Sequence, residues 1–266
     1  MSKKPKVIVL RSAGTNCDKE TAYAFEASGA MVDRVHINKL LHKEVDLHDY
    51  HILAIPGGFT YGDDIESGRI LANELRLFLG EAIDKFIADG KLVIGICNGF
   101  QILVKAHILP GKLDGEKTSR QSATLTNNDS GKFEDRWAHL KADGKSAWTK
   151  GLAEQLYFPV AHAEGKFITD EKTLGALKDN GQIAFRYCAP SGELPVYPEN
   201  PNGSLDHIAG ITDKTGRILG LMPHPERHFL FQHHPRWSRM INMGELGDGA
   251  KIFQNGVEYI KEKFLS

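Results

Sequence analysis

Ile94-Gly95-Ile96-Cys97-Asn98-Gly99-Phe100-Gln101 is the part of the sequence that says most about how the chain folds. The apolar run Leu92–Ile96 predicts a buried strand, and residues Phe100–Ala106 predict the helix that follows. Cys97 therefore stands at a sharp strand-to-helix turn, which exposes one reactive side chain. A glycine lies two residues before and two residues after it, as expected where strand and helix pack closely. The helix N-terminus would favour the thiolate.

A second motif, Met222-Pro223-His224-Pro225-Glu226, supplies what a cysteine nucleophile needs. Expelling ammonia from a carboxamide requires a proton, and a histidine can deliver one near neutral pH. Glu226 can accept a hydrogen bond from the other ring nitrogen of His224 and fix its tautomer. Taken separately, each residue has an equally good structural interpretation. Cys97 could be a small buried side chain, and His224 could be a loop residue. Together the two motifs favour a Cys97/His224/Glu226 triad.

The first half of the chain alternates apolar runs with helical stretches, which predicts a doubly wound α/β fold with a parallel sheet. The predicted strands are Lys6–Leu10, Val32–Ile37, His51–Ile55 and Leu92–Ile96, and the predicted helices are Lys19–Ser28 and Ile70–Ala88. Functional residues in such sheets follow the carboxyl ends of strands. Those ends carry Ser12–Gly14, Pro56–Phe59 and Cys97, which we expect on one rim.

The second half has shorter strands and more turn residues from about Thr124 onward, which predicts mixed or antiparallel additions. The predicted elements are a strand at Gln182–Tyr187, a hairpin of His207–Thr212 and Arg217–Met222, and a last helix near Gly249–Phe264. The triad requires the second hairpin strand to lie beside the parallel sheet, because only then does His224 reach Cys97. No repeat or linker marks a boundary, so we expect a single domain over residues 1–266.

Stabilising a tetrahedral intermediate requires backbone N–H donors. The predicted strand His51–Ile55 is followed by a loop that contains Gly57, Gly58 and Phe59, and its glycines let an amide turn inward. We predict oxyanion donors there, with the amide of Asn98 as the second donor. The alternative is that the glycines only form a tight turn. The loop follows the strand that precedes the Cys97 strand in the chain, and this position favours the oxyanion site.

Bulk properties exclude several classes of protein. The chain has 266 residues, a formal net charge of -1 and 41% hydrophobic residues, which suits one large domain with an ample core. No basic stripe with interleaved aromatic residues occurs, so we expect no nucleic-acid partner. The apolar stretch Val7–Leu10 is far too short for a signal or membrane segment. We expect a cytoplasmic protein without membrane contact.

Cysteine and histidine patterns predict no metal site. The cysteines Cys17, Cys97 and Cys188 lack metal-ligand spacing, which fits reduced thiols, and we interpret the first and last as structural. His162-Ala163-Glu164 lacks the downstream Cys-x-x-Cys of a zinc deaminase. The adjacent pair His233-His234 points in different directions. No phosphate-binding Gly-x-x-x-x-Gly-Lys-Ser/Thr motif occurs either, so we predict no cofactor and no ATP in this chain.

Seven separated stretches, in order, resemble one family of enzymes. They are Gly14–Asp18, Pro56–Asp63, Cys97–Gln101, Asn128–Trp137, Val160–Gly165, Tyr197–Ser204 and Met222–Arg227. Over nearly its whole length the chain is similar to class I (triad-type) glutamine amidotransferases, and most narrowly to the glutaminase subunits of phosphoribosylformylglycinamidine synthase.

The resemblance implies a flavodoxin-like core that hydrolyses L-glutamine through Cys97, His224 and Glu226 and passes ammonia to a synthetase subunit in de novo purine biosynthesis. That partner would use ATP and Mg, and a small bridging subunit is compatible with the same resemblance.

The resemblance also implies roles for other positions. Gln101, Ser130 and Phe133 align with positions that hold the amino-acid end of glutamine. Asn128 and Arg136 are as well suited to fix the loop around Ser130 as to touch the substrate. His162 and Glu164 would line the site or face the partner.

Two other functions stay open at this point. One is a stand-alone cysteine-dependent amidase or hydrolase of the same fold, and the other is a non-catalytic scaffold subunit. The complete triad argues against the scaffold. The loop Asn128–Arg136 and the lack of any feature specifying peptides or esters argue against the stand-alone hydrolase.

Overall fold

The computed structural model of the protein describes residues 3–112, 121–143, 145–241 and 244–266. The strands are β1 (Lys6–Arg11), β2 (Met31–His36), β3 (Ile52–Ile55), β4 (Leu92–Ile96), β5 (Ala123–Thr126), β6 (Glu134–Ala142), β7 (Gln155–His162), β8 (Lys166–Thr169), β9 (Ile183–Cys188), β10 (Ile208–Thr212) and β11 (Ile218–Leu221). The α-helices are α1 (Asp18–Ala27), α2 (Ile37–Leu41), α3 (Arg69–Phe78), α4 (Gly80–Ala88), α5 (Asn98–Lys105), α6 (Glu171–Asp179) and α7 (Ala250–Ile260).

Within the described residues, nine strands form one continuous sheet in the order β2-β1-β3-β4-β11-β10-β9-β6-β7. The pairs from β2 through β11 are parallel, and the pairs from β11 through β7 are antiparallel. β3 and β4 are buried along their whole length, as expected for parallel strands covered on both faces. The predicted parallel sheet with antiparallel additions is confirmed.

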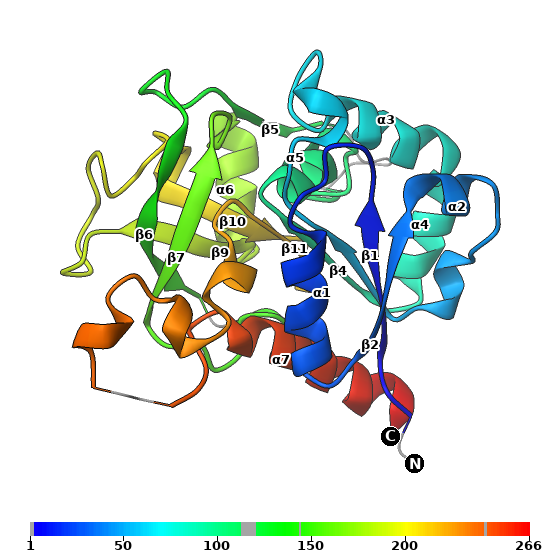
Figure 1. Ribbon diagram of the computed structural model, residues 1–266. Helices are drawn as coiled ribbons and strands as arrows, with labels where there is room; N and C mark the ends of the chain where they lie inside the picture. The colour runs from blue at the N-terminus through cyan, green and yellow to red at the C-terminus, as the bar shows by residue number, and fades with distance from the viewer. Residues whose placement is uncertain (1–2, 113–120, 144, 242–243) are drawn as a thin grey trace.

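Helices cover both faces of the parallel half. Figure 1 shows α1 and α7 together on one side of the strands, with α3, α4 and α5 on the other. The first layer packs through aromatic rings, since Phe25 of α1 lies 5.0 Å from Phe253 of α7 and 6.5 Å from Trp148, ring centre to ring centre. In the second layer α5 is buried on every side, which makes it the central helix of the fold. No described helix has the length and apolarity needed to span a membrane.

Two predicted element boundaries were wrong. The single helix expected over Ile70–Ala88 is two helices, because Leu79 leaves helical geometry with φ -120° and ψ 5°, and Gly80 starts α4. The strand expected over Val32–Ile37 ends at His36, whose imidazole accepts a hydrogen bond from the Asn38 N–H and so caps α2.

The predicted hairpin is confirmed, and its placement brings the two halves of the chain together. β10 and β11 pair antiparallel, and β11 also pairs in parallel with β4, with Leu221 opposite Ile96. The Cys97 N–H donates to the Leu221 carbonyl at 2.8 Å. The carboxyl ends of β4 and β11 therefore lie side by side, and the residues that follow them share one rim of the sheet.

Candidate active site

Cys97 sits at the elbow between β4 and α5 with a strained backbone. Its φ is 53° and its ψ is -108°, a conformation that a non-glycine residue adopts only where the surroundings enforce it. Close packing does so here, because a Cβ on Gly99 would lie 1.9 Å from the Ile55 carbonyl oxygen and one on Gly95 would lie 2.6 Å from the Gly99 oxygen. The role predicted for the two flanking glycines is confirmed.

His224 and Glu226 follow β11 on the same rim, and both are buried. The Nδ1 atom of His224 lies 2.6 Å from the Oε1 atom of Glu226, as predicted for the third triad member. Burial lowers the pKa of His224, but the Glu226 carboxylate and then Cys97 outweigh it, so the pKa lies well above 6.5. The other ring nitrogen, Nε2, is buried without a hydrogen-bond partner among the described residues. It is therefore the atom available for proton exchange with Cys97.

The predicted oxyanion loop lies directly over this pair. A Cβ on Gly57 would be 2.7 Å from the Cε1 atom of His224 and 3.4 Å from the Cβ atom of Cys97. The Phe59 N–H, however, donates to the Gly14 carbonyl at 3.0 Å. The prediction that Phe59 supplies an oxyanion donor does not agree with this geometry. Within the described chain no backbone acceptor engages the N–H of Gly57, Gly58 or Asn98, which leaves these three as candidate donors.

The turn between β1 and α1 braces the oxyanion loop, a relation that we did not predict. The N–H groups of Asn16 and Cys17 both donate to the Gly57 carbonyl, at 3.3 and 3.2 Å. The Cys17 side chain also reaches the triad, with its Sγ atom 3.9 Å from the Nδ1 atom of His224. Cys17 was interpreted only as structural. Its position just after a parallel strand, and its place in the stretch Gly14–Asp18, were the signals in the sequence that could have placed it at the rim.

Gln101 and Asn98 belong to a buried hydrogen-bond network beneath the elbow. The Gln101 side chain donates to the Glu164 carbonyl at 2.6 Å and accepts from the Asn98 side chain at 2.9 Å. Asn98 in turn accepts from the N–H and the hydroxyl of Thr60. Each polar atom of Gln101 thus makes one bond to the protein, and each keeps one further donor or acceptor position for a substrate.

The loop before β6 carries Ser130 and Phe133 to the mouth of the site. The Phe133 ring lies 6.2 Å from that of Phe59, centre to centre, and both rings are partly exposed. The Ser130 hydroxyl donates to Glu134 at 2.6 Å. Asn128 donates to the carbonyls of Lys132 and His162, so it holds this loop in place.

His162 and Glu164 have different environments. His162 is buried, and its Nδ1 atom lies 3.2 Å from the Asn128 side-chain oxygen. Glu164 stands next to the buried Lys105, at 4.0 Å, and accepts from the Ser67 N–H. Neither contacts the His224 ring through a hydrogen bond. His162 is therefore part of the packing behind the rim rather than of an open surface.

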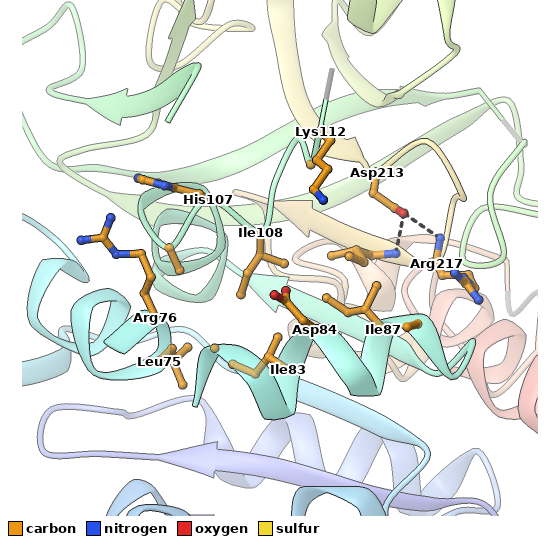
Figure 2. A pocket seen from close by; sticks show the side chains of 15 residues that line it. Leu75, Arg76, Ile83, Asp84, Ile87, His107, Ile108, Lys112, Asp213 and Arg217 are labelled. Atoms are coloured by element: carbon orange, nitrogen blue, oxygen red, sulfur yellow. Dashed lines mark hydrogen bonds between the residues drawn. The ribbon is translucent and has the colours of Figure 1, made fainter. Parts of the chain in front are cut away.

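A cavity of about 590 Å³ lies at the other end of α5, between α4 and the turn of the β10–β11 hairpin (Figure 2). Arg76, His107, Lys112 and Arg217 surround an apolar floor that includes Ile83. The cavity adjoins the carboxyl end of α5, roughly 12 Å along the helix from Cys97. It therefore belongs to the opposite rim from the triad and takes no part in its chemistry.

The fold and the site together define a class of proteins, the α/β amidotransferases with a cysteine triad at a strand-to-helix elbow. The chain belongs to the CobB/CobQ-like glutamine amidotransferase domain family, which matches residues 4–260, and within it to the PurQ subunits of phosphoribosylformylglycinamidine synthase.

Sequence similarity to known proteins extends over nearly the entire chain. The PurQ subunit of Dehalococcoides mccartyi is 48% identical over 97% of this chain and 99% of its own length. That of Methanococcus maripaludis is 42% identical over 97% of this chain and 98% of its own. Among solved structures, a chain in the structure of PurLQS from Thermotoga maritima is 28% identical, with a TM-score of 0.73 over 97% of this chain and 100% of that one.

Proposed function

We propose that this chain is the glutaminase subunit of a phosphoribosylformylglycinamidine synthase. It releases ammonia from L-glutamine and passes it to a synthetase subunit that uses ATP and Mg in de novo purine biosynthesis, in the cytoplasm. The observation that carries the proposal is the junction of β4 and β11, which sets the strained Cys97 beside the buried His224 and Glu226 pair. Full-length similarity to PurQ subunits supports the pathway and the partner.

The first half of the reaction is acyl transfer to sulfur. The Cys97 thiolate attacks the side-chain carbonyl carbon of glutamine, and the N–H groups of Gly58 and Asn98 stabilise the oxyanion. The Nε2 atom of His224 then gives its proton to the departing nitrogen, so that ammonia leaves and a glutamyl thioester remains. The Glu226 carboxylate stabilises the imidazolium before that transfer, in agreement with the raised pKa of His224.

The second half is hydrolysis of the thioester. The neutral His224 now accepts a proton from water, whose oxygen attacks the acyl carbon, and the same oxyanion donors act again. Collapse of this intermediate releases glutamate and restores the Cys97 thiolate. Ser130 and Phe133 flank the entrance, where they can hold the amino-acid end of the substrate. Gln101 can join them through its second N–H while its bond to the Glu164 carbonyl holds the side chain in place.

The test separates ammonia release from ammonia use. In a complex with the synthetase, Cys97→Ala should abolish synthesis from glutamine but leave synthesis from added ammonium, because the nucleophile serves only the first process. Product formation with each nitrogen source is measured, with Cys188→Ala as the matched control that keeps both activities. Loss of both activities in an assembled complex of Cys97→Ala would refute the proposal.

The two alternatives give other results. A stand-alone hydrolase would turn glutamine over at the same rate with or without the synthetase and would not support synthesis. A scaffold would support synthesis from ammonium only, in the wild type as well as in Cys97→Ala.

A further inference from the structure

Cys17, His224 and Glu226 form a second cluster, which gathers around the Nδ1 atom of the imidazole. Each residue offers one potential ligand atom, and these three atoms lie within 4.8 Å of one another. They are the Cys17 sulfur, a His224 ring nitrogen and a Glu226 carboxylate oxygen. All three residues are at most 1% exposed. The second carboxylate oxygen of Glu226, Oε2, is buried without a hydrogen-bond partner in the described part of the chain. The cluster thus offers a thiol, an imidazole and a spare carboxylate lone pair in one enclosed place.

This donor set is the one that Zn²⁺ prefers. Thiolate, imidazole and carboxylate bind zinc in a tetrahedron whose donor atoms lie roughly 3.5 Å apart. The Cys17 Sγ to His224 Nδ1 separation of 3.9 Å is close to that value. The Nδ1 to Glu226 Oε1 separation of 2.6 Å would have to open by roughly 1 Å. We propose that Cys17, His224 and Glu226 form a Zn²⁺ site, and that its occupation switches off the glutaminase.

Zinc binding and catalysis exclude each other because they compete for the same imidazole. The metal displaces the thiol proton of Cys17 and the proton that His224 Nδ1 shares with Glu226, and a water completes the four ligands. With Nδ1 bound to zinc, the neutral ring keeps its remaining proton on Nε2. Nε2 then has no lone pair with which to accept a proton, so His224 cannot act as a base. This inhibition rests on the proposed function, whereas the binding does not.

Arg227 sets how readily the site fills. Its Nη2 atom donates to the Cys17 sulfur at 3.0 Å, and a guanidinium in that position opposes a cation. Its Nε atom lies 3.7 Å from a carboxylate oxygen of Glu20, which offers the side chain a second partner. Movement of Arg227 toward Glu20 would free the sulfur. Zinc and Arg227 therefore compete for Cys17.

Binding is tested without activity, on the Cys97→Ala protein, so that the nucleophile cannot be the ligand. Co²⁺ is titrated in, and the absorption band from thiolate-to-cobalt charge transfer is followed, with Zn²⁺ then added to displace it. We expect the band in Cys97→Ala and in Cys97→Ala/Cys188→Ser, and its loss in Cys97→Ala/Cys17→Ser. No band in Cys97→Ala would overturn the site.

Inhibition is tested on the enzyme with Cys97 intact. Zn²⁺ should inhibit glutamine hydrolysis, and EDTA should restore it. Relative to its own zinc-free rate, Cys17→Ser should need at least about tenfold more zinc for half inhibition, since it loses a ligand, and Cys188→Ser should not differ from wild type. Arg227→Gln should need less zinc. Equal sensitivity of Cys17→Ser and wild type would place the metal on Cys97 and overturn the proposal.

The two failures are distinguishable. A wild-type complex that hydrolyses no glutamine would refute the proposed function, yet the cobalt band in Cys97→Ala would still report the site. If Cys17→Ser does not fold, Cys17→Ala replaces it in both experiments, and the Arg227→Gln shift gives an independent answer.

Discussion

Glu226 is the residue that makes His224 more than a buried imidazole. The short contact between Nδ1 and Oε1 holds the ring, and the carboxylate keeps the pKa of His224 raised against the effect of burial. An amide in its place can still hydrogen-bond the ring, but it neither stabilises the imidazolium nor enforces the tautomer. We expect Glu226→Gln to fold normally and to lose about a hundredfold or more in glutamine turnover, less than Cys97→Ala loses.

The matched control is Glu164→Gln, which changes a carboxylate of the same site region that does not touch His224. Steady-state rates of the two variants in the complex decide the assignment. Unimpaired turnover by Glu226→Gln, together with a loss in Glu164→Gln, would move the third role to Glu164.

His162 should make the protein sensitive to acid. Burial, and then the charge of His224, lower its pKa to about 4 from the ordinary 6.5. The folded protein thus keeps this ring neutral over a range where the unfolded chain is protonated. Its contribution to stability is complete above pH 6.5 and is lost as the pH falls toward 4, at about 1.4 kcal/mol per pH unit and about 3 kcal/mol in all.

The measurement is the free energy of unfolding by urea at several pH values. His162→Gln should be less stable at pH 7 but should show a shallower decline between pH 6.5 and 4 than the wild type. The exposed His42, changed to Gln, is the control and should leave the decline unaltered. Parallel curves for His162→Gln and wild type would contradict the assignment.

Helix α5 lies so close to β3 that adding one methyl group between them should push them apart. A Cβ on Gly99 would lie 1.9 Å from the Ile55 carbonyl oxygen, and backbone cannot move aside as a flexible side chain can. We expect Gly99→Ala to lower the free energy of unfolding by about 3 kcal/mol and to abolish glutamine turnover, because the elbow that holds Cys97 would shift.

Gly175→Ala in α6 is the matched control, since a Cβ there meets nothing within 4 Å. It should be neutral or stabilise by up to about 1 kcal/mol, as alanine does inside a helix. Urea midpoints for both variants give the answer, and equal midpoints would mean that α5 is free to move away from the sheet.

The elements with local signals were predictable, and those defined by distant contacts were not. The strands β1, β3 and β4 and the hairpin follow from apolar runs and turn residues. The break at Leu79 has only Gly80 as a local signal, and a single glycine inside a helical pattern does not by itself end a helix.

The same distinction holds within the site. The triad follows from two short motifs, but the contact of Cys17 with His224 joins the first strand of the chain to the last, and no local pattern reports it. The Phe59 amide was misjudged for a related reason. Its neighbouring glycine suggested freedom, whereas the bridge between Thr15 and Gly58 commits that amide to Gly14.

The assembled molecule should control when glutamine is consumed. The oxyanion loop is tied to the 12–17 turn, and Asn98 is tied through Thr60 to the segment 60–68, where the exposed Ile65 has a φ of 73°. A partner that contacts these segments can reposition an oxyanion donor without touching Cys97. One such donor is worth about 3 kcal/mol, or roughly a hundredfold in rate.

We therefore expect slow glutamine hydrolysis by the chain alone and faster hydrolysis when the synthetase, its acceptor and nucleotide are added. Steady-state glutaminase assays of each mixture measure the difference, and the synthetase with Cys97→Ala controls for activity from the partner. Equal turnover in all mixtures would exclude control by the partner.

The position of β11 between β4 and β10 also determines when, during its synthesis, the chain can first act. Cys97 leaves the ribosome early, but β11, the strand that positions the imidazole of His224, is among the last elements to emerge. Helix α7, which covers the same half of the sheet, emerges later still. A nascent chain, or one cut short before His224, carries the thiol without its acid or base. Such fragments should release no ammonia from the cell's glutamine, so hydrolysis can begin only after synthesis has passed Glu226.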